Sequence, residues 1–455
     1  MHKLLKTAFA ALLLAGAGAG VTAQASPAAS AGQIARGKAL AIAGDCMACH
    51  TQTGKPQYSG GHAIASPLGA IYATNITPSV KAGIGSYTLQ QFSDAVRLGK
   101  RADGAHLYPA MPYTAYAKLN QDDVAALYAY FMHGVAPDDT PLHETRLPFP
   151  FNLRFSMALW NALYLDDKPY QSDPARSVEW NRGAYLVQGL AHCSTCHTPR
   201  NALMAEKSGI EHFLRGSSLG TWYAPDISQD QVSGIGSWDQ QAIVSYLMSG
   251  HAPNGATAGG PMLEAIDKSF SQMPVQDVQA MATYLRTLPG GNGQTAGRPA
   301  VSAPVAPVSG SDIAEMAGQL KPGQQLYRNN CAACHQNSGD GIRGLPALRN
   351  HPMLHYPNGD NVAMAILEGV WPEHGQGMPG FAHELNDAQV ADISNYVLSD
   401  FGGSQVRIDA ARVRALRAGG ESHLMLTLAR VGMAMVVIVL LALLAWLVVR
   451  RRKVN

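Results

Sequence analysis

The sequence lacks the patterns on which several common function classes depend. It contains no evident Ser-His-Asp set, no glycine-rich phosphate-binding loop and no pair of carboxylates spaced for acid–base catalysis. Cysteine is scarce, at six residues in 455, and charged residues make up only 15% of the chain. The informative features are therefore the placement of the few cysteines and two apolar stretches near the chain ends.

A concentrated basic surface is also missing. The formal net charge is +2, but six of the 34 basic residues lie in residues 1–25 and 450–455, which contain no acidic residue. Residues 26–449 therefore hold 28 basic residues against 32 acidic ones. Because nucleic-acid binding needs a clustered positive face, we predict no nucleic-acid partner.

All six cysteines fall in three C-x-x-C-H motifs. This pattern attaches a c-type haem, because the two thiols form thioethers with the haem vinyl groups and the histidine binds the iron. We therefore predict three covalently bound haem c groups. The residues that would hold them are Cys46, Cys49 and His50, then Cys193, Cys196 and His197, then Cys331, Cys334 and His335.

Two other uses of paired cysteines fit less well. A zinc site would bring two C-x-x-C units together in one small domain, whereas the first cysteines of these motifs, Cys46, Cys193 and Cys331, are 147 and 138 residues apart. A thioredoxin-like dithiol would need a βαβ context, which the sequence does not show.

Both chain ends carry membrane-related signals. Residues 1–25 combine an early pair of lysines, an apolar run and a small-residue end, which predicts a cleaved signal peptide, with an uncleaved anchor as the alternative. Residues 431–449 contain no charge and would span about 28 Å as a helix. The four cations at 450–453 favour a cytoplasmic tail over a buried core helix. We predict a single-pass inner-membrane protein with its haem domains in the periplasm.

An internal repeat with an offset of 151 residues relates the regions around the first two motifs. Residues 73–77 (ATNIT) recur as 224–228 (APDIS), and the sequence GIGS occurs at both 83–86 and 234–237. Each motif region opens with a glycine-bearing helix and closes with an amphipathic helix. The predicted order is signal peptide 1–25, domain one 26–170, domain two 171–290, linker 291–311, domain three 312–403, connector 404–430, membrane helix 431–449 and tail 450–455.

A second axial ligand decides whether each iron is closed or open to small molecules, and a methionine thioether closes it. Met111 and Met378 stand beside prolines in loops that precede the closing helices. Domain two offers Met262 and Met273; the repeat offset from Met111 selects Met262, and Met273 is close to the closing helix. We therefore predict Met111, Met262 and Met378 as iron ligands. Ligation by a second histidine is the alternative, and the nearby candidates are His106, His251 and His374.

Longer stretches resemble the triheme cytochrome c subunits of bacterial membrane-bound dehydrogenases for alcohol, gluconate, sorbitol, fructose or aldehyde. The stretches are residues 72–78, 83–85, 106–113, 127–131, 192–201 and 378–381. The resemblance covers about residues 33–402. It implies all-α class I cytochrome c domains with His/Met-ligated haems, and electron transfer from a catalytic dehydrogenase subunit to membrane ubiquinone.

The expected fold class is all-α: three tandem class I cytochrome c domains plus one C-terminal transmembrane helix. The expected role is a non-catalytic electron-transfer subunit. Its dehydrogenase partner would carry a flavin, pyrroloquinoline quinone or molybdopterin, and this chain does not distinguish among them. The alternatives are a relay to a terminal oxidase, a haem peroxidase with an open iron, and a structural membrane adaptor.

The connector between the first two domains, residues 147–165, is unusually apolar. Packing between the two domains would explain this composition, and docking to the dehydrogenase or to the bilayer is the alternative.

Overall fold

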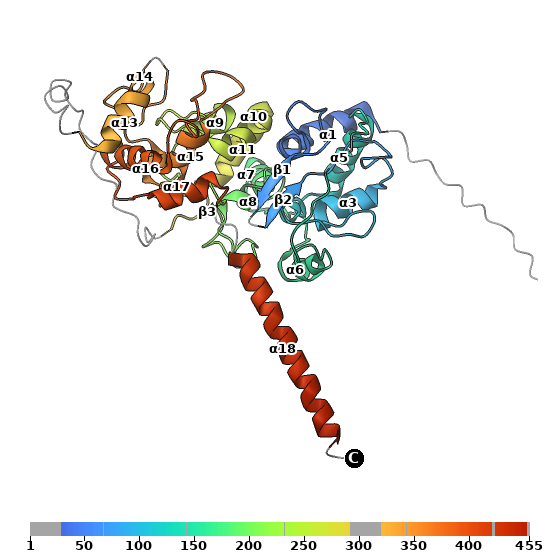
Figure 1. Cartoon of the computed structure of the whole chain (residues 1–455). Coiled ribbons are helices and arrows are strands. Elements are labelled where there is room, and N and C mark those ends of the chain that lie inside the picture. Colours follow the sequence, from blue (N-terminus) through green and yellow to red (C-terminus); the bar gives the residue numbers. More distant parts are fainter. Residues whose placement is uncertain are drawn as a thin grey trace, which may run out of the picture.

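The computed structural model describes residues 29–66, 68–141, 143–231, 233–291, 320–342, 344–420 and 424–452. The predicted signal peptide, most of the predicted linker and the last three residues of the predicted tail lie outside these ranges. The described chain forms lobes of short helices, from which one long helix projects (Figure 1). We refer to residues 29–170, 171–291 and 320–420 as the first, second and third segments.

Short helices separated by long loops build all three segments. The helices of the first segment are α1 (Ala31–Ala43), α2 (Cys46–His50), α3 (Leu89–Leu98), α4 (Tyr113–Tyr116), α5 (Gln121–His133) and α6 (Ser156–Tyr164). Those of the second are α7 (Val178–Tyr185), η1 (Leu186–Leu190), α8 (Cys193–His197), α9 (Gln240–Ser249), α10 (Gly260–Lys268), η2 (Phe270–Gln272) and α11 (Val275–Leu285). Those of the third are α13 (Pro322–Asn330), α14 (Ala332–His335), η3 (Pro352–His355), α15 (Asp360–Glu368), α16 (Asp387–Tyr396), η4 (Val397–Phe401) and α17 (Ala410–Arg417).

The described residues also contain two small antiparallel strand pairs, which the all-α expectation did not include. Strand β1 (Ala63–Ser66) pairs with β2 (Gly69–Tyr72), and β3 (Arg215–Ser218) pairs with β4 (Tyr223–Asp226). Each strand has four residues, so these hairpins order loops around the helices and do not form a separate layer.

A glycine lies at the crossing of the opening and closing helices in every segment. A Cβ atom on Gly37 of α1 would lie 2.0 Å from the carbonyl oxygen of Ala126 on α5. The corresponding distance is 1.9 Å from Gly183 to the Ala280 oxygen, and 2.1 Å from Gly323 to the Asp392 oxygen. These distances are far below any real carbon–oxygen contact, so the backbones approach this closely only because glycine has no side chain. The predicted glycine-bearing helices therefore pack directly on the closing helices.

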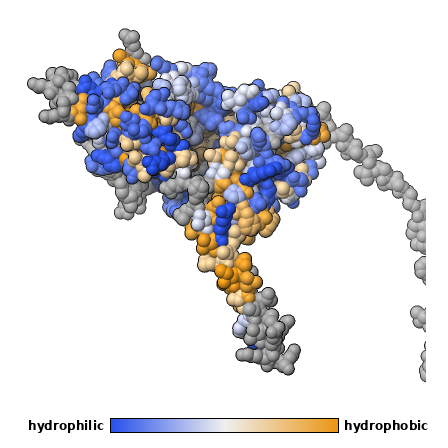
Figure 2. Space-filling model, in the orientation of Figure 1, coloured by the Kyte–Doolittle hydropathy of each residue, from blue (hydrophilic) through white to orange (hydrophobic). Residues whose placement is uncertain are grey.

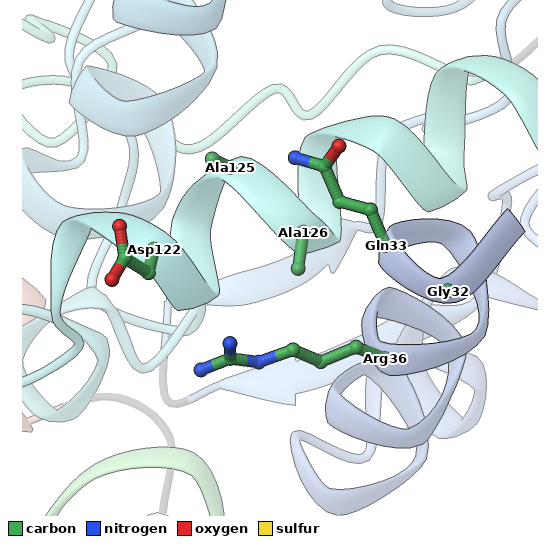
Figure 3. A pocket seen from close by; sticks show the side chains of 6 residues that line it. All are labelled: Gly32, Gln33, Arg36, Asp122, Ala125 and Ala126. Atoms are coloured by element: carbon green, nitrogen blue, oxygen red, sulfur yellow. The ribbon is translucent and has the colours of Figure 1, made fainter. Parts of the chain in front are cut away.

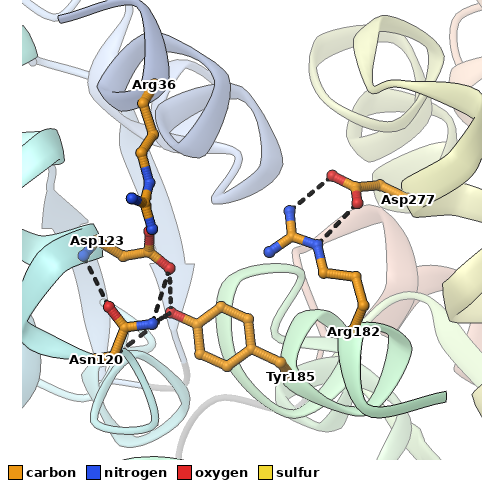
Figure 4. Close-up of polar contacts among 6 residues, drawn as sticks. All are labelled: Arg36, Asn120, Asp123, Arg182, Tyr185 and Asp277. Atoms are coloured by element: carbon orange, nitrogen blue, oxygen red, sulfur yellow. Dashed lines mark hydrogen bonds and ion pairs between the residues drawn. The ribbon is translucent and has the colours of Figure 1, made fainter. Parts of the chain in front are cut away.

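An arginine–aspartate pair reinforces this crossing in the first two segments (Figure 4). Arg36 contacts Asp123 at 2.6 Å, and Arg182 contacts Asp277 at 2.7 Å. Each arginine directly precedes the crossing glycine; in the third segment, Pro322 stands at that position. A groove beside the first pair is lined by Gly32, Gln33, Arg36, Asp122, Ala125 and Ala126 (Figure 3). None of these six residues belongs to a C-x-x-C-H motif, so the groove is a feature of the helix crossing and not a haem site.

The first and second segments share one hydrophobic core, whereas the third segment has its own. Leu40 and Leu127 belong to the same buried cluster as Leu186 and Val278. The cluster of the third segment is centred on side chains such as Tyr327 and Val390, and it also contains Trp222 from the second segment.

Helix α17 lies inside the predicted connector and folds onto the third segment. Its Val413 and Leu416 are buried in the core of that segment. Arg412 contacts Asp360 at 2.8 Å, and Arg417 contacts Asp387 at 2.9 Å. The folded part of the third segment therefore continues past residue 403.

Helix α18 (Leu424–Arg452) projects from the lobes as a single long rod (Figure 1). Its window Leu426–Leu443 has a mean hydropathy of 2.4, and none of this window is buried inside the protein. By length and composition, this helix is sufficient to cross a membrane.

Candidate haem sites

Each C-x-x-C-H motif begins a short helical turn directly after the opening helices. Helices α2 and α8 hold the first two motifs, and α14 begins one residue after Cys331. Residues three and four apart share a helix face, so the two cysteines and the histidine of one motif converge on one side. Asp45 and His192, which precede the first two motifs, have left-handed backbone conformations with φ of 50° and 36°. At these residues the chain changes direction between the opening helices and the motif.

Five of the six motif cysteines are half-buried, and Cys334 is exposed. Burial raises the pKa of Cys46, Cys49 and Cys193 to about 12, and that of Cys196 and Cys331 to about 11. A thiol with a raised pKa carries little thiolate at neutral pH and is a poor redox or nucleophilic cysteine. The environment therefore disfavours a dithiol redox centre, and it fits thiols that are consumed in covalent attachment.

The histidine of every motif is oriented by a backbone carbonyl. The Nδ1 atom of His50 lies 2.6 Å from the Thr74 oxygen, that of His197 2.7 Å from the Pro225 oxygen, and that of His335 3.1 Å from the Pro346 oxygen. Burial lowers the pKa of all three imidazoles, which favours the neutral form. A neutral histidine that donates through Nδ1 leaves Nε2 as a metal ligand. All three imidazoles thus make, through Nδ1, the carbonyl hydrogen bond that is typical of metal-bound histidine.

The sequence repeat creates this contact in the first two segments. Thr74 and Pro225 are equivalent positions of the repeat, and each is followed by a side chain that closes a tight turn. Asn75 Oδ1 accepts from the Thr77 N–H at 2.8 Å, and Asp226 Oδ1 accepts from the Ser228 N–H at 2.8 Å. The turn therefore fixes the carbonyl that precedes it. These carbonyl partners were not predicted from the sequence, because every residue has a backbone carbonyl. The repeat, in which Thr74 and Pro225 are equivalent positions, is the sequence signal that marks them.

The three predicted methionine ligands occupy half-buried positions. Met111 and Met262 pack against the shared core of the first two segments, as do Cys46 and Cys193. Met262 lies in the first turn of α10 and not in a loop. Met273, the alternative, is only 4% exposed inside the core itself. Met378 lies in a backbone bridge with Val370, in which both N–H···O distances are 2.8–2.9 Å.

The alternative histidine ligands lie in different surroundings. His251 and His374 are exposed. His106 is partly buried, and its Nδ1 atom has no hydrogen-bond partner within the described residues. The Oδ1 atom of Asp45 is buried and also has no hydrogen-bond partner within the described residues. Buried polar atoms without partners indicate an absent polar group; a haem, with its propionates, fits this need at the first site.

The first and second motifs approach each other closely. Tyr116 of α4 donates to the Gly44 oxygen at 2.6 Å, and its ring lies 5.8 Å from that of His192. Helix α10, which carries Met262, packs on α2. Burial raises the pKa of Asp45 to about 8, and the nearby Glu264 adds to the rise while Lys268 opposes it. Elements of both segments therefore surround the first motif.

The second and third sites approach through their methionine regions. Lys268 at the end of α10 pairs with Glu373, and the Glu373 N–H donates to Asp267 Oδ2 at 3.0 Å. Val370, the bridge partner of Met378, packs against the core that also contacts Met262. The second site thus lies between the first and the third.

Comparison with known proteins agrees with this geometry. The family model described as cytochrome c matches residues 34–134, 181–289 and 320–400. The chain is 42% identical over 462 residues to the fructose dehydrogenase cytochrome subunit of Gluconobacter japonicus, with 92% of this chain and 91% of the relative covered. It is 35% identical over 437 residues to the alcohol dehydrogenase (quinone) cytochrome c subunit of Gluconacetobacter polyoxogenes, with 92% and 91% covered. It is also 35% identical over 400 residues to the gluconate 2-dehydrogenase cytochrome c subunit of Pantoea cypripedii, with 84% and 89% covered. With three matched regions, each containing one C-x-x-C-H motif, and relatives aligned over nearly their full length, the chain belongs to the cytochrome c family.

Proposed function

We propose that this protein is a triheme electron-transfer subunit, with three cytochrome c domains that each hold one covalent haem c. The observation that carries this proposal is the shared geometry of the three motifs. In each of them, two thiols and a neutral imidazole share one turn, and a backbone carbonyl holds the imidazole Nδ1. When bound, each haem supplies a one-electron redox centre at its iron.

The residues of this chain would hold each iron through a histidine and a methionine. The cysteine pairs of the three motifs would form the thioethers, and His50, His197 and His335 would bind the iron. Met111, Met262 and Met378, in the half-buried positions described above, would supply the second protein ligand to each iron. An iron bound by both a histidine and a methionine of this chain would have no open position for a peroxide or oxygen substrate, which favours electron transfer over haem peroxidase chemistry.

The packing of the segments supports a linear arrangement of the three redox centres. Because the second site contacts the first through α10 and the third through the Lys268–Glu373 region, a haem held by the second motif would lie between those of the other two. The chain therefore acts as a linear relay.

The donor is a catalytic dehydrogenase subunit that oxidises an alcohol, sugar or aldehyde, and the acceptor is membrane ubiquinone. The names of the relatives support this assignment, since they are cytochrome subunits of fructose, quinone-dependent alcohol and gluconate dehydrogenases. We further propose that a signal peptide directs export, that α18 crosses the inner membrane once, and that the cations from Arg450 onward stay in the cytoplasm.

Two matched substitutions test the iron ligands of the second site. Met262→Leu removes a thioether from the proposed ligand position, whereas Met273→Leu changes a core methionine of similar volume. We expect Met262→Leu to open one of three irons to carbon monoxide in the reduced protein, and Met273→Leu to bind none. Carbon monoxide binding by the unmodified protein, or by Met273→Leu alone, would contradict this assignment.

Removing the subunit tests the function itself. In purified membranes, dehydrogenase-dependent ubiquinone reduction should disappear when this chain is deleted and return when it is supplied again. Undiminished quinone reduction after deletion, together with lost electron delivery to a terminal oxidase, would favour the oxidase relay.

A further inference from the structure

Helix α6 turns an apolar face outward. Phe155 at its N-cap, Leu159 and Leu163 are 74%, 68% and 61% exposed, and Ala158 and Ala162 are exposed as well. These five positions follow the spacing i, i+3, i+4, i+7, i+8, which forms one continuous stripe on a helix. The helix contains no charged residue.

The polar side chains of α6 point toward the protein. Asn161 Oδ1 accepts from the Tyr113 hydroxyl at 2.8 Å, and its amide donates to the Leu98 oxygen at 3.0 Å. The Trp160 indole donates to the Leu203 oxygen at 3.0 Å. A surface helix of a protein surrounded by water has the reverse arrangement, with its apolar stripe on the core. Hydrogen bonds therefore hold α6 in an orientation that leaves its apolar stripe uncovered.

The stripe lies on the side of the lobes from which α18 leaves. Figure 1 shows α6 below the first segment, at the level where α18 begins, and Figure 2 shows apolar surface on this side that runs to the upper turns of α18. The hydrogen bond from Trp160 brings Leu203, which is 55% exposed, next to the helix, so the second segment extends the apolar surface. In a protein held by α18, this side is the one that faces the bilayer.

We propose that the α6 stripe inserts into the interfacial layer of the bilayer that α18 crosses. This inference rests on the proposed membrane crossing by α18. An interfacial helix lies along the membrane plane with its apolar face at the boundary of headgroups and acyl chains, and an uncharged helix whose outward stripe carries Phe155, Leu159 and Leu163 suits that depth. A single membrane helix leaves the lobes free to rotate about its axis; α6 provides a second contact, which fixes the orientation of the haem lobes above the membrane.

The test measures the depth of a nitroxide label in the complete haem-loaded protein, reconstituted in phosphatidylcholine nanodiscs. All six native cysteines are used in thioethers, so a single new cysteine is labelled uniquely. The positions are Leu159→Cys on α6, Val437→Cys on α18 as the lipid reference, and Val178→Cys on α7, which is 88% exposed, as the water reference. The protein is first reduced with dithionite, so that the low-spin irons are diamagnetic, is then freed of reductant without air, and only afterwards receives the nitroxide label. Accessibility to oxygen and to a water-soluble nickel chelate is then compared.

We expect the oxygen-to-nickel accessibility ratio of the Leu159 label to lie well above that of the Val178 label and below that of the Val437 label. Equal ratios at Leu159 and Val178, with a lipid value at Val437, would overturn the α6 inference and leave the α18 anchor intact. Water-like values at all three positions would contradict the anchor itself. A Leu159 label that becomes inaccessible to both reagents only when the dehydrogenase binds would show a protein interface, and would also overturn the inference.

Discussion

The contact between the first and second segments is built differently from the contact between the second and the third. The first two segments share one apolar core, and a buried polar network joins them, in which the Tyr185 hydroxyl donates to Asp123 Oδ2 at 2.5 Å. The second and third segments meet mainly through polar pairs. The Asn361 side chain bonds both the N–H and the oxygen of Tyr223, at 2.7 and 2.9 Å. Among apolar side chains, Trp222 enters the core of the third segment and Val370 packs against the shared core.

This difference assigns the segments to two cooperative units. Loss of a shared apolar core removes the burial energy of both partners, so the first and second segments should unfold together. A polar contact contributes less, because its groups exchange one set of hydrogen bonds for another with water. The third segment should therefore unfold as an attached unit, with a transition of its own.

The largest expected effect tests this division. Gly37→Ala places a Cβ atom 2.0 Å from the Ala126 oxygen, so α1 must move away from α5 and leave gaps in the shared core. We expect a loss of about 3 kcal/mol or more in the free energy of unfolding. In calorimetry of the haem-loaded protein, one transition that covers the first and second segments should shift, while that of the third stays in place.

Two matched variants sharpen this experiment. Gly32 lies on the same helix, and a Cβ atom there meets nothing within 4 Å, so Gly32→Ala should leave the transition unchanged or raise its stability by up to about 1 kcal/mol. Gly323→Ala makes the same clash in the third segment, with the Asp392 oxygen at 2.1 Å, and should shift the third transition alone. If Gly37→Ala or Gly323→Ala shifted the unfolding transitions of all three segments, the three segments would form one cooperative unit.

The next effect is a pH dependence at the contact of the first two segments. Burial raises the pKa of Asp45 to about 8 in the folded protein, against about 4 in an unfolded chain. The folded state thus keeps a proton that the unfolded state has lost, and stability decreases as the pH rises from about 4 to 8, by at most about 1.4 kcal/mol per pH unit. Denaturation of Asp45→Asn at a series of pH values should show a flatter profile and a gain over the parent near pH 8, whereas the exposed Asp167→Asn should follow the parent.

A smaller pH dependence of opposite sign is expected at the contact of the second and third segments. Burial lowers the pKa of His351 to about 4, and its Nε2 atom accepts from the Thr257 N–H at 3.2 Å. The pKa of His351 is lower in the folded protein than in the unfolded chain. The neutral imidazole therefore stabilises the folded state fully above about pH 6.5, and this contribution is lost as the pH falls toward 4. The third calorimetric transition of the parent should shift downward over this range. In His351→Gln that pH shift should vanish, while stability at pH 7 falls by about 1–3 kcal/mol; an unchanged acid profile would contradict the role of His351.

The smallest effect concerns the ion pair between Lys268 and Glu373. Their side chains are 33% and 42% exposed, and such pairs contribute about 0–1 kcal/mol and weaken with salt. Lys268→Ala should lower the third transition slightly in dilute buffer and hardly at all in 1 M salt. A large, salt-independent loss would mean that this contact carries more of the second–third interface than its exposure indicates.

Much of the site could be predicted from the sequence, because its parts are local. The C-x-x-C-H motifs, the crossing glycines and the repeat around Thr74 and Pro225 are read directly from short stretches. The contacts between segments could not be predicted in this way. The placement of α10 against the first motif and the burial of Trp222 in the third core depend on how separate folded pieces meet. The outward stripe of α6 needed the structure as well, since its spacing is equally typical of a helix that packs inward.

The central claim is that three motifs each bind one haem c, and the most direct measurement is the count of covalent haems on the full chain. Intact-mass analysis of the exported protein, combined with its pyridine haemochrome absorbance, should give three haems per polypeptide. The double variant Cys331→Ala/Cys334→Ala should carry two haems. The absorbance spectrum of the parent minus that of the variant should be the spectrum of one low-spin haem. A protein that carries two or fewer haems when all six cysteines are present would contradict the account.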